Sequence, residues 1–169
     1  MPVWLIRADQ QRGSEAEVIH SGRVAVGDAE LANLSTFADK ASLREYLRAR
    51  NPSQPDEECK RTSNMLWRFM HKVQRNDSVL VPVGDGSTFL MGTVESAYRY
   101  LPDAPAEDRH SRQVYWRSPG IAASELPQSV TEEAGLLTQV RPREAEDAVF
   151  ASFERLSQTG WVKDGLAPE

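Results

Sequence analysis

The sequence has little of what builds covalent or metal-dependent sites. Cys59 is its one cysteine, which excludes an internal disulfide bond. The three histidines, His20, His71 and His110, lie far apart, so the close spacing typical of metal ligands does not occur. We therefore expect a protein without a metal ion or other cofactor.

Long hydrophobic runs are missing as well. No apolar stretch approaches the roughly 18 residues that a membrane span requires, and residues 1–7 lack the basic region and apolar run of a signal peptide. The 169 residues are 40% hydrophobic and 27% charged, as is ordinary for a globular domain. We therefore expect a cytoplasmic protein with no membrane partner.

Patterns that indicate catalysis are also missing. A nucleophilic triad needs a base beside its nucleophile, whereas the histidines lie in polar or cationic stretches. Asp56, Glu58 and Lys60 spell the letters of a metal-dependent nuclease, but they lie in one predicted loop and cannot hold a cation between two strands. We therefore predict no catalytic residue and no enzyme activity for this chain.

The charge is distributed unevenly along the chain. The net charge of −5 argues against indiscriminate binding to a polyanion. Residues 132–169 hold eight acids and four bases, so residues 1–131 together carry only −1. Between Lys60 and Arg75 there are five cations and no acid, a local charge of +5. This segment is the strongest candidate for contact with an anionic partner.

Short strands and helices alternate along the chain. Hydrophobic periodicity predicts helices over residues 15–20, 42–50, 62–74, 126–136 and 143–156, and strands over residues 3–8, 23–27, 78–83, 88–96, 111–116 and 137–141. Gly84-Asp85-Gly86 indicates a hairpin turn and not a phosphate loop, because no helix follows it. The strands are too closely spaced for repeated parallel crossovers. We therefore predict an α+β fold, a mixed β-barrel of five to six strands with flanking helices.

The helix predicted over residues 62–74 has two different faces. An apolar face recurs at helical spacing, as on a helix packed against a core, and carries Leu66, Phe69, Met70 and Val73. A hydrophilic face carries Arg61, Asn64, Arg68, Lys72 and Arg75, with Trp67 at the border. Two interpretations stay open: the hydrophilic face is simply solvated, or it binds nucleic acid, with Asn64 on a base edge.

Aromatic and basic residues alternate at two strand ends. One is Tyr98-Arg99-Tyr100, and the other is Arg109-His110-Ser111-Arg112, which leads into Tyr115-Trp116. Aromatic rings stack on bases while arginines hold phosphates, so this pattern is typical of a nucleic-acid interface. Packing inside a sheet accounts equally well for these aromatics and for Trp4 of the first strand, and both interpretations stay open.

The chain also carries a series of short motifs in a fixed order. They are Val3-Trp4-Leu5-Ile6-Arg7-Ala8, Val24-Ala25-Val26-Gly27, Asn33-Leu34-Ser35, Leu66-Trp67-Arg68-Phe69, Asp77-x-Val79-Leu80-Val81-Pro82, Met91-Gly92-Thr93-Val94, Tyr98-x-Tyr100, Pro102-Asp103 and Arg109-His110-x-Arg112-x-Val114-x-Trp116. In this order they resemble the N-terminal domain of Mrr-like restriction proteins, over roughly residues 3–141. The run from Tyr98 to Trp116 is the most specific part of the resemblance.

The resemblance implies a PUA-like (EVE-like) barrel, related to YTH and SRA-type readers. Such domains flip one base out of its helix and hold it between aromatic rings. Flipping costs a few kcal/mol, stacking returns about 1 to 3 kcal/mol per base, and cationic contacts to the backbone supply the remainder. The expected partner is therefore double-stranded DNA that carries a modified base.

The residue patterns and the resemblance together predict two sets of site residues. The expected nucleic-acid contacts are Arg61, Asn64, Arg68, Lys72, Arg75, Arg99, Arg109 and Arg112. The expected base pocket consists of Trp4, Asp28, Trp67, Tyr98 and Trp116. Relatives often carry a tryptophan at the position of Asp28, so this carboxylate either accepts from an exocyclic amino group of the base or only forms the turn after Gly27.

Mrr-like proteins join this domain to a nuclease, whereas nothing nuclease-like follows residue 141. We predict a reader domain over residues 1–142 and a C-terminal helix and tail over residues 143–169, which either end a stand-alone reader or lead to a nuclease domain outside this chain. The expected function is a DNA-binding module of a restriction or anti-phage defence system that targets a fused or partner nuclease. Two alternatives stay open, a protein-interaction or regulatory barrel without a base pocket and an RNA-binding PUA-like domain.

Overall fold

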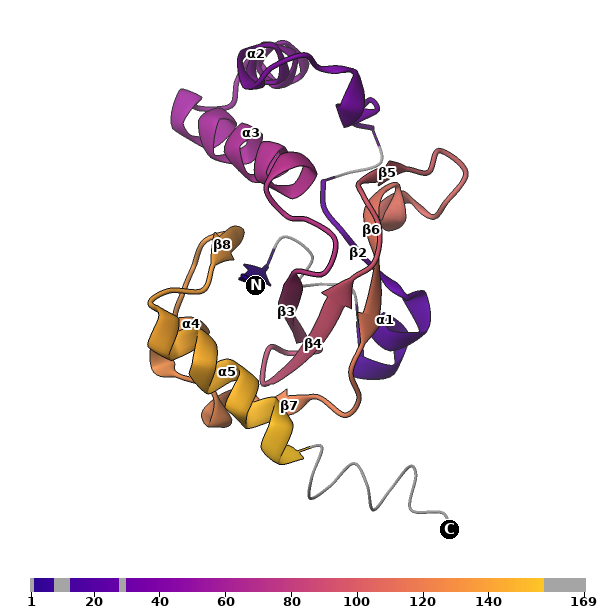
Figure 1. The fold of residues 1–169 in the computed structure, drawn as a ribbon. Coiled ribbons are helices and arrows are strands. Elements are labelled where there is room, and N and C mark those ends of the chain that lie inside the picture. Colours follow the sequence, from indigo (N-terminus) through magenta and orange to yellow (C-terminus); the bar gives the residue numbers. More distant parts are fainter. Residues whose placement is uncertain (1, 8–12, 28–29, 157–169) are drawn as a thin grey trace.

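A mixed β-sheet, curled into a half barrel and flanked by helices, forms the body of the protein (Figure 1). The structure is a computed structural model that describes residues 2–7, 13–27 and 30–156. The strands run in the order β2-β6-β4-β3-β1-β8, while β5 pairs with β6 and β7 pairs with β4. The predicted α+β class and the barrel-like curl of the sheet are thereby confirmed.

The strands are β1 (Val3–Ile6), β2 (Arg23–Ala25), β3 (Ser78–Val83), β4 (Thr88–Val94), β5 (Arg99–Tyr100), β6 (His110–Trp116), β7 (Ile121–Ala122) and β8 (Leu137–Gln139). The pair β1–β3 is parallel, and the other pairs are antiparallel. The turn predicted between β3 and β4 is confirmed, with φ angles of 59° at Gly84 and 89° at Gly86. Only glycine adopts such angles at low cost.

The helices are α1 (Glu15–Ser21), α2 (Lys40–Arg50), α3 (Asp56–His71), α4 (Gln128–Thr131) and α5 (Arg143–Leu156). The predicted start of α3 at residue 62 is wrong, because residues 56–58 form its first turn. Their three acidic side chains suit the positive end of the helix dipole. The predicted helix over residues 126–136 is also wrong beyond Thr131, where α4 ends, because the chain bends at Leu136 and begins β8 at Leu137.

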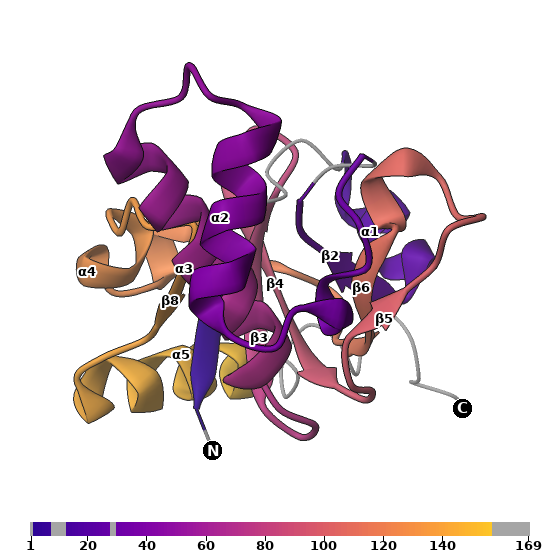
Figure 2. The ribbon, with the colours of Figure 1, turned by 90° about the horizontal axis from the view of Figure 1, so that it is seen from above.

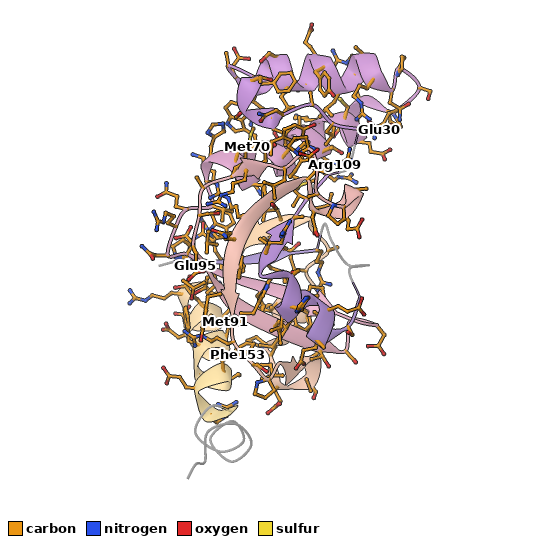
Figure 3. The ribbon with its side chains drawn as sticks, turned by 90° about the vertical axis from the view of Figure 1, so that its right-hand side faces the viewer. Glu30, Met70, Met91, Glu95, Arg109 and Phe153 are labelled. Atoms are coloured by element: carbon orange, nitrogen blue, oxygen red, sulfur yellow. The ribbon has the colours of Figure 1, made fainter. Side chains whose placement is uncertain are left out.

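The two faces of the sheet pack into two separate hydrophobic cores. Side chains alternate along β1, so Trp4 and Ile6 join the core closed by α2 and α3, while Val3 and Leu5 join the core closed by α4 and α5. We call these two sides the α3 face and the α5 face of the sheet. Figure 3 shows the two sides in side view, with Met70 on α3 and Phe153 on α5. Because helices cover both faces, β1 and β3 are buried along their whole length.

The helix α5 belongs to this body and is not a linker. Its Ala145, Val149 and Phe153 are buried against the α5 face, where Leu5 and Ile121 also lie. The boundary predicted at residue 142 stays a prediction, and the structure adds that α5, directly after it, packs against the α5 face of the sheet. The tail beyond residue 156 lies outside the described residues.

Arg112 joins the sheet to the end of α3 from inside the molecule. Only 2% of this residue is exposed. Its Nε donates to the carbonyl of Phe69 (2.8 Å), its Nη2 to that of Met70 (2.7 Å) and its Nη1 to that of Ser96 (3.0 Å). The last carbonyls of a helix lack partners within the helix, so the guanidinium supplies donors where α3 needs them.

Arg112 remains positively charged although it is buried. Removal from water lowers the pKa of Arg112 to about 10, while the nearby Asp77 carboxylate opposes this shift. The guanidinium is therefore protonated at neutral pH, and its bonds to the three carbonyls are charge-assisted hydrogen bonds.

Replacing Arg112 by methionine should lower the free energy of unfolding by about 3 to 5 kcal/mol, because buried carbonyl groups then lose their partners. The variant Arg112→Lys should recover only part of this loss, since a single ammonium cannot reproduce the planar fork. The measurement is urea unfolding followed by circular dichroism. Arg99→Met, at an exposed arginine of β5, is the control and should change stability by less than about 0.5 kcal/mol. Equal stability of Arg112→Met and the native protein would contradict the structural role.

Candidate nucleic-acid interface

The hydrophilic face of α3 and of the turn after it is solvent-exposed, as predicted. Arg61, Arg68, Lys72 and Arg75 are exposed and Asn64 is partly buried, while the opposite side of the helix packs into the α3-face core. We call these five residues the cationic ridge. The acids of residues 56–58 lie at the other end of the same helix, so the positive charge is concentrated toward its C-terminus.

A hollow of about 170 Å³ lies between the cationic ridge and the loop that enters β8. Its lining consists of Arg61, Asn64, Met65, Arg68 and residues 135–138. Arg68 crosses toward the opposite wall, where its Nη1 donates to the carbonyl of Leu137 at 3.2 Å. The ridge and the edge strand β8 therefore form the two sides of one depression, which has arginines at its rim and apolar side chains in its lining.

The structure separates the other three predicted cations from this depression. Arg99 is exposed on β5, and Arg109 is partly buried with its Nε donating to the carbonyl of Ala104 at 3.2 Å. Arg99 lies on β5 and Arg109 directly before β6. Figure 2 shows β5 and β6 on the other side of the molecule from β8. The prediction that Arg112 contacts phosphate is wrong, since its guanidinium is buried on the carbonyls that end α3.

Trp4 is a core residue in this structure and not an open pocket wall. It is 7% exposed, and its indole Nε1 donates to the carboxylate of Asp77 at 3.0 Å. The same carboxylate accepts the backbone N–H of Gln74 at 2.9 Å. Trp4 therefore links β1 to the turn between α3 and β3, and its burial favours the packing interpretation.

Trp116 is likewise 7% exposed, but its indole N–H has no hydrogen-bond acceptor among the residues that the structure describes. Its ring lies across Gly92 of the neighbouring strand β4, where a Cβ atom would come within 2.8 Å of Trp116 Cε3 and 2.4 Å of Val114 Cγ1. Glycine at this position is therefore what lets the ring lie flat on the α3 face. A buried N–H without a partner is uncommon in folded proteins.

Trp67 and Tyr98, the other predicted pocket aromatics, are half-buried and engaged in local contacts. The ring of Trp67 lies 4.1 Å from the ring of His71, one turn further along α3. The Tyr98 hydroxyl accepts the backbone N–H of Leu34 at 3.1 Å and is hydrogen-bonded to Nδ1 of His110 at 2.7 Å. The four aromatics do not form one open ring-walled cage, and Asp28 lies outside the described residues.

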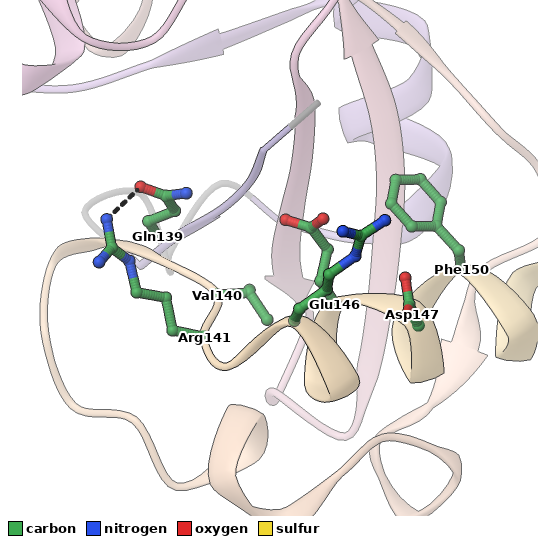
Figure 4. A pocket seen from close by; sticks show the side chains of 7 residues that line it. Gln139, Val140, Arg141, Glu146, Asp147 and Phe150 are labelled. Atoms are coloured by element: carbon green, nitrogen blue, oxygen red, sulfur yellow. Dashed lines mark hydrogen bonds between the residues drawn. The ribbon is translucent and has the colours of Figure 1, made fainter.

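The sequence analysis missed the segment of residues 135–138, which leads into β8, and a polar cavity between the end of β8 and α5. That cavity, of about 560 Å³, is lined by Gln139, Val140, Arg141, Arg143, Glu146, Asp147 and Phe150 (Figure 4). No local pattern in these residues marks a site, because the walls come from β8 and α5 and meet only in the folded chain. Charges of both signs line this cavity, unlike the hollow beside α3.

The described part of the chain has neither a metal-binding cluster nor a membrane-spanning helix. Its histidine, cysteine and carboxylate side chains form no cluster of three or more that could hold a metal ion. None of its helices is both long and apolar enough to cross a membrane.

A family model described as Domain of unknown function (DUF8426) matches residues 4–135. The chain belongs to this family. The DUF8426 match begins in β1 and ends at Gly135, on the wall of the hollow, so it includes the whole cationic ridge. No curated protein and no solved structure matches the chain significantly.

Tyr98 of this DUF8426 member should lose its proton at a higher pH than a tyrosine in water. Burial raises the pKa of Tyr98 from 10.0 to about 12. The folded state therefore keeps the proton while the unfolded state loses it, so the contribution of Tyr98 to stability is complete below pH 10 and is lost as the pH rises toward 12. Absorbance titration of tyrosinate in the native protein and in Tyr98→Phe measures this. If Tyr98→Phe lacks a tyrosinate signal with a midpoint near pH 10, and keeps the one near pH 12, the raised pKa does not belong to Tyr98.

Proposed function

We propose that this chain is a DNA-binding module that recognises a modified base in duplex DNA. The observation that carries the proposal is the cationic ridge, whose four cations are exposed in a chain with a net charge of −5. Nucleic-acid phosphates release counterions when they meet such a surface, and this supplies affinity for any sequence. The hollow beside the ridge adds a depression in which part of the ligand is desolvated.

The finer assignment of the fold is a PUA-like barrel of the EVE-like type. It is supported by the curled mixed sheet, by the helices on both of its faces and by the motif order that resembles Mrr-like N-terminal domains. In that setting the module serves a restriction or anti-phage defence system in the cytoplasm, and the DNA site it occupies is passed to a fused or partner nuclease. The chain itself acts as a reader without catalysis.

Trp116 supports base recognition in a form that differs from the expected cage. Its buried indole N–H has no acceptor among the described residues, and such a group costs about 1 to 3 kcal/mol. Acceptor atoms on a base edge are natural partners for this donor. We therefore assign to Trp116 a hydrogen bond to the extruded base, in place of the stacking role. Because Trp116 is only 7% exposed, this contact requires the core side chains that cover its indole to move aside when the base enters.

The DNA-binding proposal is tested by fluorescence anisotropy with labelled duplexes that contain N6-methyladenine, 5-methylcytosine, 5-hydroxymethylcytosine or no modification. We expect salt-dependent binding to all of them and tighter binding to one modified duplex. The double variant Lys72→Glu/Arg75→Glu should weaken binding to every duplex alike and reduce the slope of log affinity against log salt by about 2.

The matched control is Lys40→Glu/Arg117→Glu, which changes the net charge equally at two exposed residues outside α3 and the turn after it. Its affinity should fall much less than that of the ridge variant. Equal losses in the two variants, or equal weak binding of all duplexes at low salt, would refute a specific reader. Tighter binding of single-stranded RNA in competition would make the module an RNA-binding one.

Trp116→Phe removes the indole N–H and keeps an aromatic ring on Gly92. We expect the preference for the modified duplex to fall by about tenfold, the loss of one hydrogen bond to a base. Binding of the unmodified duplex and its salt dependence should stay as in the native protein. Tyr46→Phe is the control, because it also removes one polar group and keeps an aromatic ring, at a partly buried residue of α2 outside both predicted sets of site residues. An unchanged preference in Trp116→Phe would remove this residue from the recognition step.

A further inference from the structure

The hollow between α3 and β8 differs in charge from the other cavities around the β8 edge. The cavity of about 560 Å³ beside α5 includes Glu146 and Asp147, and a smaller one of about 120 Å³ includes Glu133. The lining of the hollow includes Arg61 and Arg68 and no acid among its described residues. The Glu133 carboxylate lies beside this hollow, where it accepts the backbone N–H of Gly135 at 2.9 Å. With two arginines in its lining and this one carboxylate beside it, the hollow has an excess of positive charge, which favours an anion.

The side chains of the ridge converge on this hollow because of helical geometry. Arg61, Asn64 and Arg68 lie three and four residues apart, so they occupy one side of α3 on successive turns. The rise between Arg61 and Arg68 is about 10 Å, a span that two long arginine side chains close from opposite ends. Asn64 lies between them with an amide that donates hydrogen bonds.

The opposite wall holds Arg68 in position. The backbone carbonyl of Leu136 and the backbone N–H of Val140 point toward β1. The first accepts from Arg7 N and the second donates to Val3 O, both at 2.8 Å. The carbonyl of Leu137 therefore points away from β1, and it accepts from Nη1 of Arg68. This bond uses one of the five N–H donors of the guanidinium and holds the side chain across the hollow.

The hollow has room for one oxyanion. A water molecule occupies about 30 Å³ in the liquid, so 170 Å³ accommodates a group of five or six heavy atoms, such as phosphorus with its four oxygens. Arginine forks bind phosphate oxygens with two parallel hydrogen bonds. Gly135 shapes this wall, since a Cβ atom there would lie 2.6 Å from Cγ2 of Thr138.

We propose that this hollow, lined by Arg61, Asn64 and Arg68, is the binding site for one backbone phosphodiester of the DNA. The inference rests on the proposed DNA-binding function and adds a defined anchor to the general attraction of the ridge. One phosphate held there fixes the position of the duplex relative to β8, whereas Lys72 and Arg75 contribute charge without such a contact.

The test combines phosphate neutralisation in the DNA with removal of charge in the protein. A set of duplexes, each carrying one neutral methylphosphonate at a different position, is measured against the native chain and Arg61→Gln/Arg68→Gln. We expect one position at which neutralisation weakens native binding by about tenfold, the loss of one charge-assisted contact. At that position the variant should lose no further affinity, because the partner of the phosphate is already gone.

Two controls separate this contact from a general loss of charge or of fold. Lys60→Gln removes one cation from the same turn of α3 outside the lining, and it should keep the sensitive position of the native chain. Arg68→Lys keeps the charge and loses the fork, so it should retain the salt dependence and lose part of the sensitivity. Thermal unfolding of each variant checks that the fold is as stable as in the native chain.

Inorganic phosphate titration, followed by NMR of the Asn64 side-chain amide and the backbone amides of residues 135–138, is the independent arm. Shifts of these signals together with one sensitive position support the inference. DNA binding without a sensitive position overturns it and leaves the proposed function standing; shifts with phosphate in that case mean an adventitious ion only. Shifts without any DNA binding overturn the DNA assignment and leave a site for free phosphate. If neither DNA nor phosphate binds, both proposals fall.

Discussion

The buried guanidinium of Arg112 is the interaction on which the rest of this structure depends. It joins three parts that are distant in sequence: the strand β6 that carries it, the carbonyl ends of α3, and the segment after β4 at Ser96. A cation in an interior is costly unless polar partners surround it, and here backbone carbonyls provide them. The position of α3 against the sheet follows from this arrangement, and with it the position of the cationic ridge.

A second polar link supports the first. Asp77 receives Trp4 Nε1 and Gln74 N, so β1, the turn after α3 and the start of β3 meet at one carboxylate. Its charge also favours the protonated form of Arg112. Two buried polar residues thus orient the helix whose outer face carries the proposed function, while the apolar cores on either side of the sheet supply most of the burial.

The arginines of this chain show how one residue type takes different roles by position alone. Arg112 is enclosed and serves the fold, Arg68 is exposed and also bonded to Leu137, and Arg75 is exposed beyond the end of α3. In the sequence, each of these arginines belongs to a segment rich in cations, and nothing in those segments distinguishes the buried arginine from the exposed ones. A motif of arginines and aromatics therefore indicates nucleic acid only for those members that reach solvent, and here the β6 motif contributes mainly to the core.

The α+β class, the hairpin at residues 84–86 and the two faces of α3 could be predicted from the amino-acid pattern, because hydrophobic period and turn chemistry are local properties. The same pattern also predicts which cations lie on the solvent side of α3, since helical spacing places Arg61, Arg68 and Lys72 opposite Leu66 and Phe69. The burial of Trp4, Trp116 and Arg112 could be seen only in the folded chain. The same holds for the packing of α5 against the second core and for the position of residues 135–138 opposite the ridge. Whether a side chain is buried, and which side chains meet at a site, depends on contacts between segments that are far apart in the chain. A local pattern therefore does not show which arginine or aromatic ring such contacts will cover.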